Sequence, residues 1–206
     1  MSEYLKENNV YRLPAEWETQ EAVWFAWTTR DDLWPGYLEE VQNRFIELYK
    51  LCSDFQKVNI LCPENEQANL IRLLNPQNQK NEIIVHTYET DDVWIRDYGP
   101  IFLKHKNKGK LISTDWLFNA WGNKFDLFKK DNGVPKWLSS QLNIKNISFP
   151  KILEGGAIET NGEGMLCTTK NVLKNPNRNQ GNRSIDWDTC LYQSLGIEST
   201  LWFENG

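Results

Sequence analysis

The apolar residues of this 206-residue chain recur in patterns that predict alternating strands and helices. A continuous apolar run from Ala22 to Trp27 predicts a strand buried on both faces. From Tyr37 to Phe55, apolar residues recur every three or four positions, which predicts an amphipathic helix. The other expected elements are strands at 58–62, 82–87 and 199–203, helices at 63–74, 135–142 and 184–195, and a hairpin joining 101–103 to 111–116.

Turn and cap residues mark where several of these elements begin and end. Pro63 is expected in the first turn of its helix, and Ser184 and Gly196 are expected to bracket the last helix. Asn161-Gly162 lies between two alternating runs, which is a strong hairpin signal. Gly155-Gly156, just before that hairpin, indicates a close approach of two backbones or a positive φ angle. Residues 1–12 are polar, and we expect a loose arm there.

Helices and hairpins together predict the α/β class with a mixed sheet, because hairpins are antiparallel while strand–helix–strand units are parallel. The chain has no linker, low-complexity segment or recognisable repeat. We therefore expect residues 1–206 to form a single domain.

Composition narrows the class of protein. The chain is 40% hydrophobic and 25% charged with a net charge of −5, which is typical of a soluble globular protein. The mild acidity disfavours nucleic acid and favours a cationic ligand. No apolar run could span a membrane and no signal core follows Met1, so we expect a cytoplasmic protein. The four cysteines form no Cys-x-x-Cys pair, which argues against zinc and disulfides and for buried, reduced thiols.

The most informative stretch runs from Thr90 to Gly99-Pro100. Val93–Ile95 is expected to be a short buried strand that delivers Asp97 at its tip. An ionised carboxylate in such a place requires a cation, which the protein or a ligand must supply. Trp94 would offer a flat aromatic face, and a carboxylate beside such a face suits a planar guanidinium.

Each of these residues also has a plain structural interpretation. Judged alone, Trp94 is more often a core tryptophan, and Asp97 a turn acid or a partner of Arg178. Glu154 is also explained as half of an ion pair, and Gly155-Gly156 as a tight turn. We expect Arg96 and the loop 175–179 to be structural, Asp91 and Asp92 to be solvated, and His86 and His105 to have no special role.

Several stretches occur together, and in the same order, in one family of enzymes. The chain resembles the agmatine deiminase and bacterial (Porphyromonas-type) peptidyl-arginine deiminase family, and its pattern matches agmatine deiminase best. A small departure is Thr28, where the family pattern has Pro. The stretches that carry the resemblance are Pro14–Glu18, Val23–Trp27, Trp34–Gly36, Asp92–Pro100, Phe118–Gly122, Leu153–Glu159 and Asn175–Asn179.

The resemblance implies a five-bladed pseudo-symmetric α/β propeller, the pentein fold, with the active site in its central channel and with neither metal nor cofactor. It implies that a Cys thiolate attacks a guanidinium carbon, that ammonia leaves with a proton from His, and that water opens the covalent intermediate. On matching positions, Asp97 becomes a guanidinium-binding carboxylate, Trp94 shapes or stacks on the pocket, and Glu154 is a second acid near it. The implied substrate is agmatine and the product N-carbamoylputrescine, on a route to putrescine.

One departure from the family pattern is large. The family's His-x-Asp segment and its nucleophilic Cys in a Gly-rich loop have no counterpart in residues 1–206. The chain thus resembles the N-terminal part of a longer enzyme, and we expect it to be inactive alone. Two alternatives stay open: deimination of arginine in peptides, and a catalytically dead module that binds guanidinium through Trp94, Asp97 and Glu154. A homo-oligomer is compatible with both.

Overall fold

A computed structural model describes residues 10–179 and 185–205 of the chain. These residues divide into two compact units. The first unit comprises the described residues up to Glu18 and from Arg96 onward, and the second unit comprises Thr19–Ile95. The single-domain expectation therefore stays a prediction, and each unit is described by itself.

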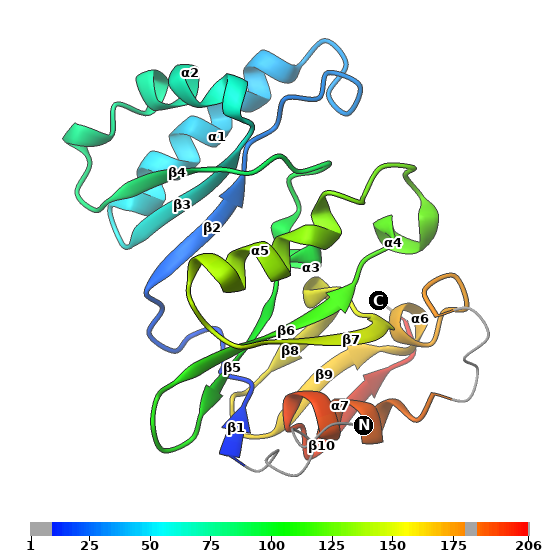
Figure 1. Cartoon of the computed structure of the whole chain (residues 1–206). Helices are drawn as coiled ribbons and strands as arrows, with labels where there is room; N and C mark the ends of the chain where they lie inside the picture. Colours follow the sequence, from blue (N-terminus) through cyan, green and yellow to red (C-terminus); the bar gives the residue numbers. More distant parts are fainter. Residues whose placement is uncertain (1–9, 180–184, 206) are drawn as a thin grey trace. The chain divides into compact units, whose positions relative to one another are not determined.

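The second unit is a parallel sheet with two helices. Strand β2 (Ala22–Ala26) pairs with β3 (Lys57–Cys62), which pairs with β4 (Ile83–Thr87), all parallel. Helices α1 (Leu38–Ser53) and α2 (Glu64–Leu74) connect these strands and lie together on one face of the sheet (Figure 1). The four elements expected between residues 37 and 87 are thus confirmed.

Burial within the second unit follows the position of each strand in the sheet. Val58, Ile60 and Cys62 of the central strand β3 are fully buried and pack with Ile46 and Tyr49 of α1. The expectation that the strand beginning at Ala22 is buried on both faces was wrong, because β2 lies at the sheet edge and most of its residues are only partly buried. Pro63 precedes α2 as its N-cap residue, and Asn75 ends the helix in a left-handed conformation before a 3₁₀ turn, η3 (Pro76–Asn78).

The first unit contains a four-stranded mixed sheet in the order β1-β5-β6-β7. The expected hairpin is confirmed as β5 (Ile101–His105) and β6 (Leu111–Leu117), which are antiparallel. Two edge strands flank it: β1 (Tyr11–Arg12) and β7 (Asn146–Ile152). The sequence patterns predicted neither edge strand. β1 is very short, and Pro150 within β7 is tolerated only because that strand lies at an edge.

A second, three-stranded sheet of the first unit has the order β10-β9-β8. The hairpin predicted at Asn161-Gly162 is confirmed as β8 (Ile158–Thr160) and β9 (Met165–Thr169), and β10 (Ser199–Phe203) pairs with β9 in parallel. Helix α7 (Trp187–Leu195) precedes β10 and begins at Asp186, whose side chain accepts a hydrogen bond from the Thr189 backbone N–H. The predicted N-cap Ser184 lies outside the described residues, and Gly196 ends the helix in a left-handed conformation as expected.

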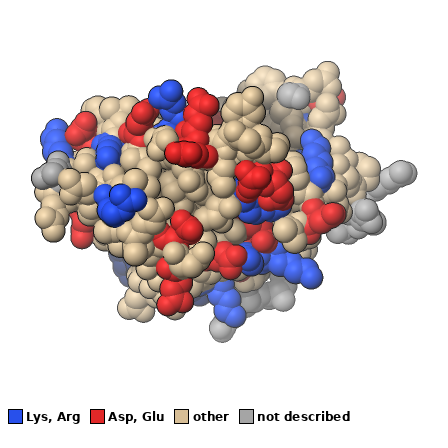
Figure 2. Space-filling view, turned by 90° about the horizontal axis from the view of Figure 1, so that it is seen from above, with Lys and Arg blue, Asp and Glu red and all other residues tan. Residues whose placement is uncertain are grey.

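Shorter elements complete the first unit: α3 (Ile95–Tyr98, which begins at the last residue of the second unit), α4 (Ala120–Asn123), η4 (Asp131–Gly133), α5 (Val134–Gln141), η5 (Gly155–Ala157) and α6 (Lys170–Leu173). The expected α/β composition is confirmed, but the described strands form three small sheets rather than one mixed sheet. No closed propeller is formed by the described residues. On the face shown in Figure 2, acidic and basic side chains are interspersed without a continuous basic patch.

Candidate functional site

The stretch around Asp97 forms a helical turn rather than the end of a strand. Residues 93–94 are irregular and α3 begins at Ile95, so the predicted strand Val93–Ile95 was wrong. The Asp92 carboxylate accepts a hydrogen bond from the Val93 backbone N–H at 2.7 Å, a local turn contact that competes with strand formation. Asp97 is consequently carried on α3 and is partly buried.

Two donors hold the Asp97 carboxylate in the first unit. The indole Nε1–H of Trp121 donates to Oδ2 at 3.2 Å, and the backbone N–H of Gly156 also donates to the carboxylate. Burial raises the pKa of Asp97, while these donors and the charges of Arg96 and Arg178 lower it in part. None of the described Lys or Arg residues forms an ion pair with Asp97. A partly desolvated carboxylate of this kind can bind a cation.

Gly155 and Gly156 allow the backbone after Glu154 to approach α3. A Cβ atom on Gly155 would lie 2.5 Å from the carbonyl oxygen of Arg96, and one on Gly156 would lie 2.2 Å from Oδ1 of Asp97. Any side chain at either position would therefore displace α3 or its carboxylate. The predicted close approach is confirmed, and neither glycine needs a positive φ angle.

Glu154 lies beside this glycine pair and is almost completely buried. Its Oε1 accepts a hydrogen bond at 2.8 Å from Nε of Arg178, whose side chain is 10% exposed. The plain interpretation of Glu154 as half of an ion pair is thus confirmed. Because Arg178 bonds to Glu154, it does not form an ion pair with Asp97.

Trp121 is the residue of this site that sequence reasoning missed. Its backbone has a φ of 57°, between Ala120 at 49° and Gly122 at 89°, and this left-handed turn directs the indole toward Asp97. The Asn119 side chain accepts a hydrogen bond from the Gly122 N–H, and a Cβ on Gly122 would lie 2.3 Å from the side chain of Asn177. The available signal was the stretch Phe118–Gly122, which we used only for the resemblance.

Trp94 belongs to the second unit, and its indole is half exposed. Asp97 lies near the Glu154–Arg178 pair. Gly156, which follows Glu154 by two residues, packs against the Asp97 carboxylate, and the charge of Arg178 lowers the pKa of Asp97. The pairing of Trp94 with Asp97 stays a prediction.

The other charged residues of the stretch have bonding partners in the protein, and Arg96 among them is half exposed. The expectation for Asp91 and Asp92 was wrong: Asp91 is buried, and burial raises the pKa of Asp92. The Arg30 guanidinium donates to the Asp91 carbonyl at 2.9 Å. Within the first unit, Arg96 forms ion pairs with Glu16 and, at 3.6 Å, with Glu159, and its interpretation as structural stays a prediction.

The loop 175–179 is also structural, as expected. The Asn179 side chain accepts a hydrogen bond from the Ile152 N–H at 3.0 Å and donates one to the Ile152 carbonyl at 3.1 Å. This pair of bonds attaches the loop to β7.

The described cysteines and histidines show no sign of catalytic activation. All four thiols are free, and burial raises the pKa of Cys52 and Cys190 and raises that of Cys62 to about 12. A thiol with a raised pKa is a poor nucleophile at neutral pH. His86 stacks on Trp24 with ring centroids 4.9 Å apart. Within the described ranges, no three His, Cys, Asp or Glu side chains are grouped to hold a metal ion.

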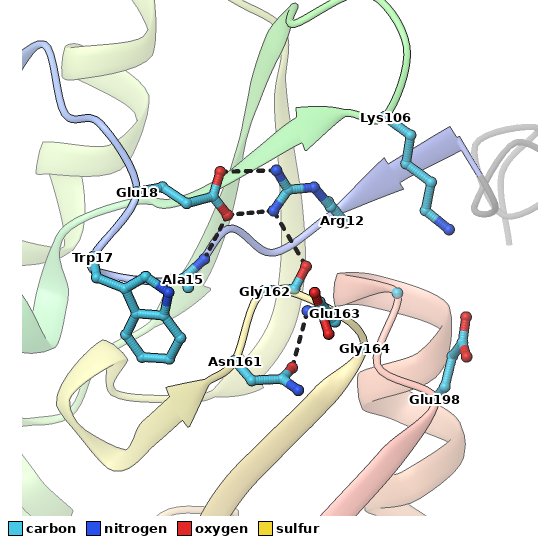
Figure 3. A pocket seen from close by; sticks show the side chains of 11 residues that line it. Arg12, Ala15, Trp17, Glu18, Lys106, Asn161, Gly162, Glu163, Gly164 and Glu198 are labelled. Atoms are coloured by element: carbon cyan, nitrogen blue, oxygen red, sulfur yellow. Dashed lines mark hydrogen bonds and ion pairs between the residues drawn. The ribbon is translucent and has the colours of Figure 1, made fainter.

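A pocket of about 510 Å³ lies elsewhere in the first unit, between the segment 12–18 and the loop of the β8–β9 hairpin. Figure 3 shows Arg12 facing Glu18, with the Gly162 carbonyl accepting a further bond from Arg12. Arg12 donates twice to the Glu18 carboxylate, once at 2.8 Å, and lowers the pKa of Glu18 to about 2. None of Trp94, Asp97 and Glu154 lines this pocket, and the bond from Arg12 to the Gly162 carbonyl attaches the segment to the hairpin loop.

Comparison with known proteins identifies the family. The family described as Porphyromonas-type peptidyl-arginine deiminase matches residues 12–206, so the chain belongs to this family. An agmatine deiminase of Pseudomonas aeruginosa (strain UCBPP-PA14) is 32% identical over 201 residues, which cover 95% of this chain and 53% of the relative.

Solved structures give the same result for the fold. The agmatine deiminase of Enterococcus faecalis superposes with a TM-score of 0.89 at 29% identity, over 97% of this chain and 55% of that one. An agmatine deiminase of C. jejuni with substrate bound superposes with a TM-score of 0.83 at 33% identity, over 95% of this chain and 56% of that one. The chain therefore has the fold of these enzymes over about half of their length. None of the helices in the described residues has the length and apolar character needed to cross a bilayer.

Proposed function

We propose that this chain carries the guanidinium-binding acid, Asp97, of an amidine hydrolase that acts on agmatine. The observation on which the proposal depends is the Asp97 carboxylate, which is held by Trp121 and Gly156, shifted by burial toward its neutral form, and without an ion pair among the described residues. A guanidinium entering beside it would neutralise the charge and donate N–H bonds to the carboxylate in a planar arrangement. Membership of a deiminase family supports this interpretation.

The proposed reaction is covalent hydrolysis within a five-bladed propeller. A Cys thiolate forms a bond to the guanidinium carbon, and the C–N bond to the departing nitrogen breaks as His supplies a proton and ammonia leaves. Water then adds to the same carbon, the C–S bond breaks, and N-carbamoylputrescine is released. Acids rather than oxyanion donors suit this path, because the substrate and the intermediate carry positive charge. Asp97 is the guanidinium-binding acid we assign, Glu154 lies near it as a second acid paired with Arg178, and Trp94 would lie against the guanidinium plane.

Residues 1–206 contain neither the His-x-Asp segment nor a cysteine in a Gly-rich loop. We therefore expect binding without turnover when this chain is tested by itself. Incubation of the purified 206-residue chain with agmatine should yield no ureido product in a colorimetric assay. Detection of product would overturn this part of the proposal.

Calorimetric titration with agmatine tests the assigned carboxylate. Asp97→Asn should weaken binding about tenfold or more, because a hydrogen bond to a charged group contributes about 1.5–3 kcal/mol. Glu18→Gln is the matched control, since Arg12 already neutralises that carboxylate, and its affinity should equal that of the unmodified chain. Equal affinity for Asp97→Asn and the unmodified chain would remove the basis of the proposal.

A further inference from the structure

The short element α4 is a run of residues with left-handed backbone conformations. The φ angle is 49° at Ala120, 57° at Trp121, 89° at Gly122 and 60° at Asn123. Glycine adopts such angles readily, but Ala120 and Trp121 each carry a Cβ atom that crowds the following carbonyl oxygen in this conformation. Residues other than glycine normally visit it singly rather than in runs. A run of this kind persists only where surrounding contacts hold it, and such backbone is concentrated at functional sites.

Asn119 holds the start of this turn with both polar groups of its side chain. Its Oδ1 accepts a hydrogen bond from the Gly122 backbone N–H at 2.9 Å, which closes the turn over Trp121. Its Nδ2 donates to the backbone carbonyl of Asn177 at 2.9 Å, which attaches the turn to the loop 175–179. The Asn119 residue is only 8% exposed, so water does not readily replace either bond.

The loop 175–179 supports the turn from the other side. A Cβ atom on Gly122 would lie 2.3 Å from Nδ2 of Asn177 and 2.9 Å from Nη1 of Arg178, so the loop packs directly against the turn. Arg178 donates from Nη1 to Oδ1 of Asn177 at 3.0 Å and from Nε to Glu154 at 2.8 Å. The largely buried ion pair with Glu154 therefore fixes the surface on which the turn rests.

The turn and the glycine pair meet the Asp97 carboxylate at different oxygens. The indole Nε1–H of Trp121 donates to Oδ2 at 3.2 Å, and a Cβ atom on Gly156 would lie 2.2 Å from Oδ1. The bonds of Asn119 and Arg178 connect these two supports to each other through the loop 175–179. A carboxylate whose orientation is fixed before a planar cation arrives loses less freedom when that cation binds.

We propose that Asn119 is a positioning residue for guanidinium binding, which holds the left-handed turn so that the indole of Trp121 is directed at Asp97. Asn177 assists by packing against Gly122. This inference rests on the proposed function of Asp97 and extends it to a residue that acts through Trp121 rather than on the carboxylate itself. A purely structural role for Asn119 would change stability alone, whereas a positioning role also changes Asp97.

A ¹³C NMR titration of the Asp97 carboxyl carbon, made without ligand, tests the role of Asn119. Asn119→Ala should raise the pKa of Asp97, as Trp121→Phe does, by less than about one unit. The double variant should match Trp121→Phe alone, because Asn119 acts only through the indole. Asn161→Ala is the matched control, since its Oδ1 accepts two backbone N–H bonds in the turn of the β8–β9 hairpin, and it should leave the Asp97 pKa unaltered.

Two results of this titration would overturn the proposal. One is an unchanged pKa of Asp97 in a folded Asn119→Ala variant. The other is a double variant whose shift equals the sum of the two single shifts, because independent contributions add and contributions through one hydrogen bond do not.

Calorimetric titration with agmatine separates this proposal from the proposed function. Asn119→Ala should weaken binding about fivefold, which corresponds to the loss of one hydrogen bond. Equal affinity for Asp97→Asn and the unmodified chain would overturn the proposed function. Unchanged affinity for Asn119→Ala, together with weakened binding by Asp97→Asn, would overturn the positioning role alone.

Asn119→Ser keeps the test decisive where the alanine variant does not fold. A serine hydroxyl can accept the Gly122 N–H as the asparagine oxygen does. The serine variant should therefore keep the Asp97 pKa and the agmatine affinity closer to those of the unmodified chain than Trp121→Phe does. Far-ultraviolet circular dichroism establishes that each variant is folded, and a folded serine variant that shifts Asp97 as far as Trp121→Phe would contradict the assigned bond.

Discussion

Two carboxylates of the first unit, Asp97 and Glu18, lie next to glycine-containing loops and are held in opposite ways. Glu18 is bound twice by Arg12, and its pKa falls to about 2. Asp97 is bound by an indole and a backbone N–H, and its pKa is raised by burial. Arg178 is the arginine near Asp97 that could neutralise a carboxylate as Arg12 does, but it pairs with Glu154 instead.

The difference separates a carboxylate with a structural role from one suited to a ligand. Arg12 satisfies the charge of Glu18, so little is gained when another cation approaches. Neutral donors satisfy the geometry of Asp97 without cancelling its charge, so a cationic ligand would gain from it. Family membership alone does not make this distinction, because both acids occur in stretches that resemble the family.

The largest effect is expected at the buried ion pair beside Asp97. Arg178→Met would leave the Glu154 carboxylate buried without a partner and should lower the free energy of unfolding by about 3–5 kcal/mol. Arg12→Met, the corresponding change at the partly exposed Glu18, should cost only about 1 kcal/mol. Urea unfolding followed by circular dichroism measures both. Equal losses would show that the two regions do not differ in the way described.

The next largest effect concerns the close approach of the glycine pair to α3. Gly155→Ala would place a Cβ 2.5 Å from the Arg96 carbonyl, and the strain should lower the free energy of unfolding by about 2–3 kcal/mol. Gly36→Ala is the control, because a Cβ there meets no atom within 4 Å and only the positive φ is unfavourable, at about 1 kcal/mol. Thermal unfolding compares the two, and a smaller loss for Gly155→Ala than for the control would refute the close approach.

The Arg12–Glu18 pair predicts that the free energy of unfolding falls as the pH is lowered below about 4.5. The pKa of Glu18 is about 2 in the folded chain and near 4.5 without the pair, so the unfolded chain takes up a proton more readily. The stabilisation is therefore complete above about pH 4.5 and is lost as the pH falls toward 2, by about 1–2 kcal/mol. Urea titrations between pH 6 and pH 2 should show a shallower decline for Glu18→Gln, and an unchanged pH profile would argue that the pair contributes nothing.

The smallest expected effect is a change in the pKa of Asp97 when its hydrogen bond from Trp121 is removed. Trp121→Phe removes a donor to the ionised carboxylate, so the pKa of Asp97 should rise further, by less than about one unit for a bond of about 1 kcal/mol. A ¹³C NMR titration of the Asp97 carboxyl carbon measures this change. Trp202→Phe, which removes a donor to Asp188 instead, should leave that titration unaltered, and a fall in the Asp97 pKa would contradict the assigned hydrogen bond.

Local patterns predicted much of the fold because they reflect local physics. The apolar repeat of α1, the Asn161-Gly162 hairpin and the left-handed Gly196 each depend on residues close together in the chain. The glycine pair was predicted to allow a close approach, since only a missing side chain permits one. The family stretches singled out Asp97 and Glu154 as acids of interest, and their roles in binding stay predictions.

Contacts between distant residues decided the rest. The pairing of Glu154 with Arg178 and the indole of Trp121 directed at Asp97 join segments 24 residues apart in the sequence, so no local pattern encodes them. Strand propensity predicted the wrong structure at Val93–Ile95, because the hydrogen bond from the Val93 backbone N–H to the Asp92 carboxylate competes with strand pairing. The sequence by itself determined which residues could form strands, helices and turns. Only the tertiary structure determined which carboxylate received an arginine, because that depends on which segments are packed together, and burial then sets the pKa of the carboxylate left without one.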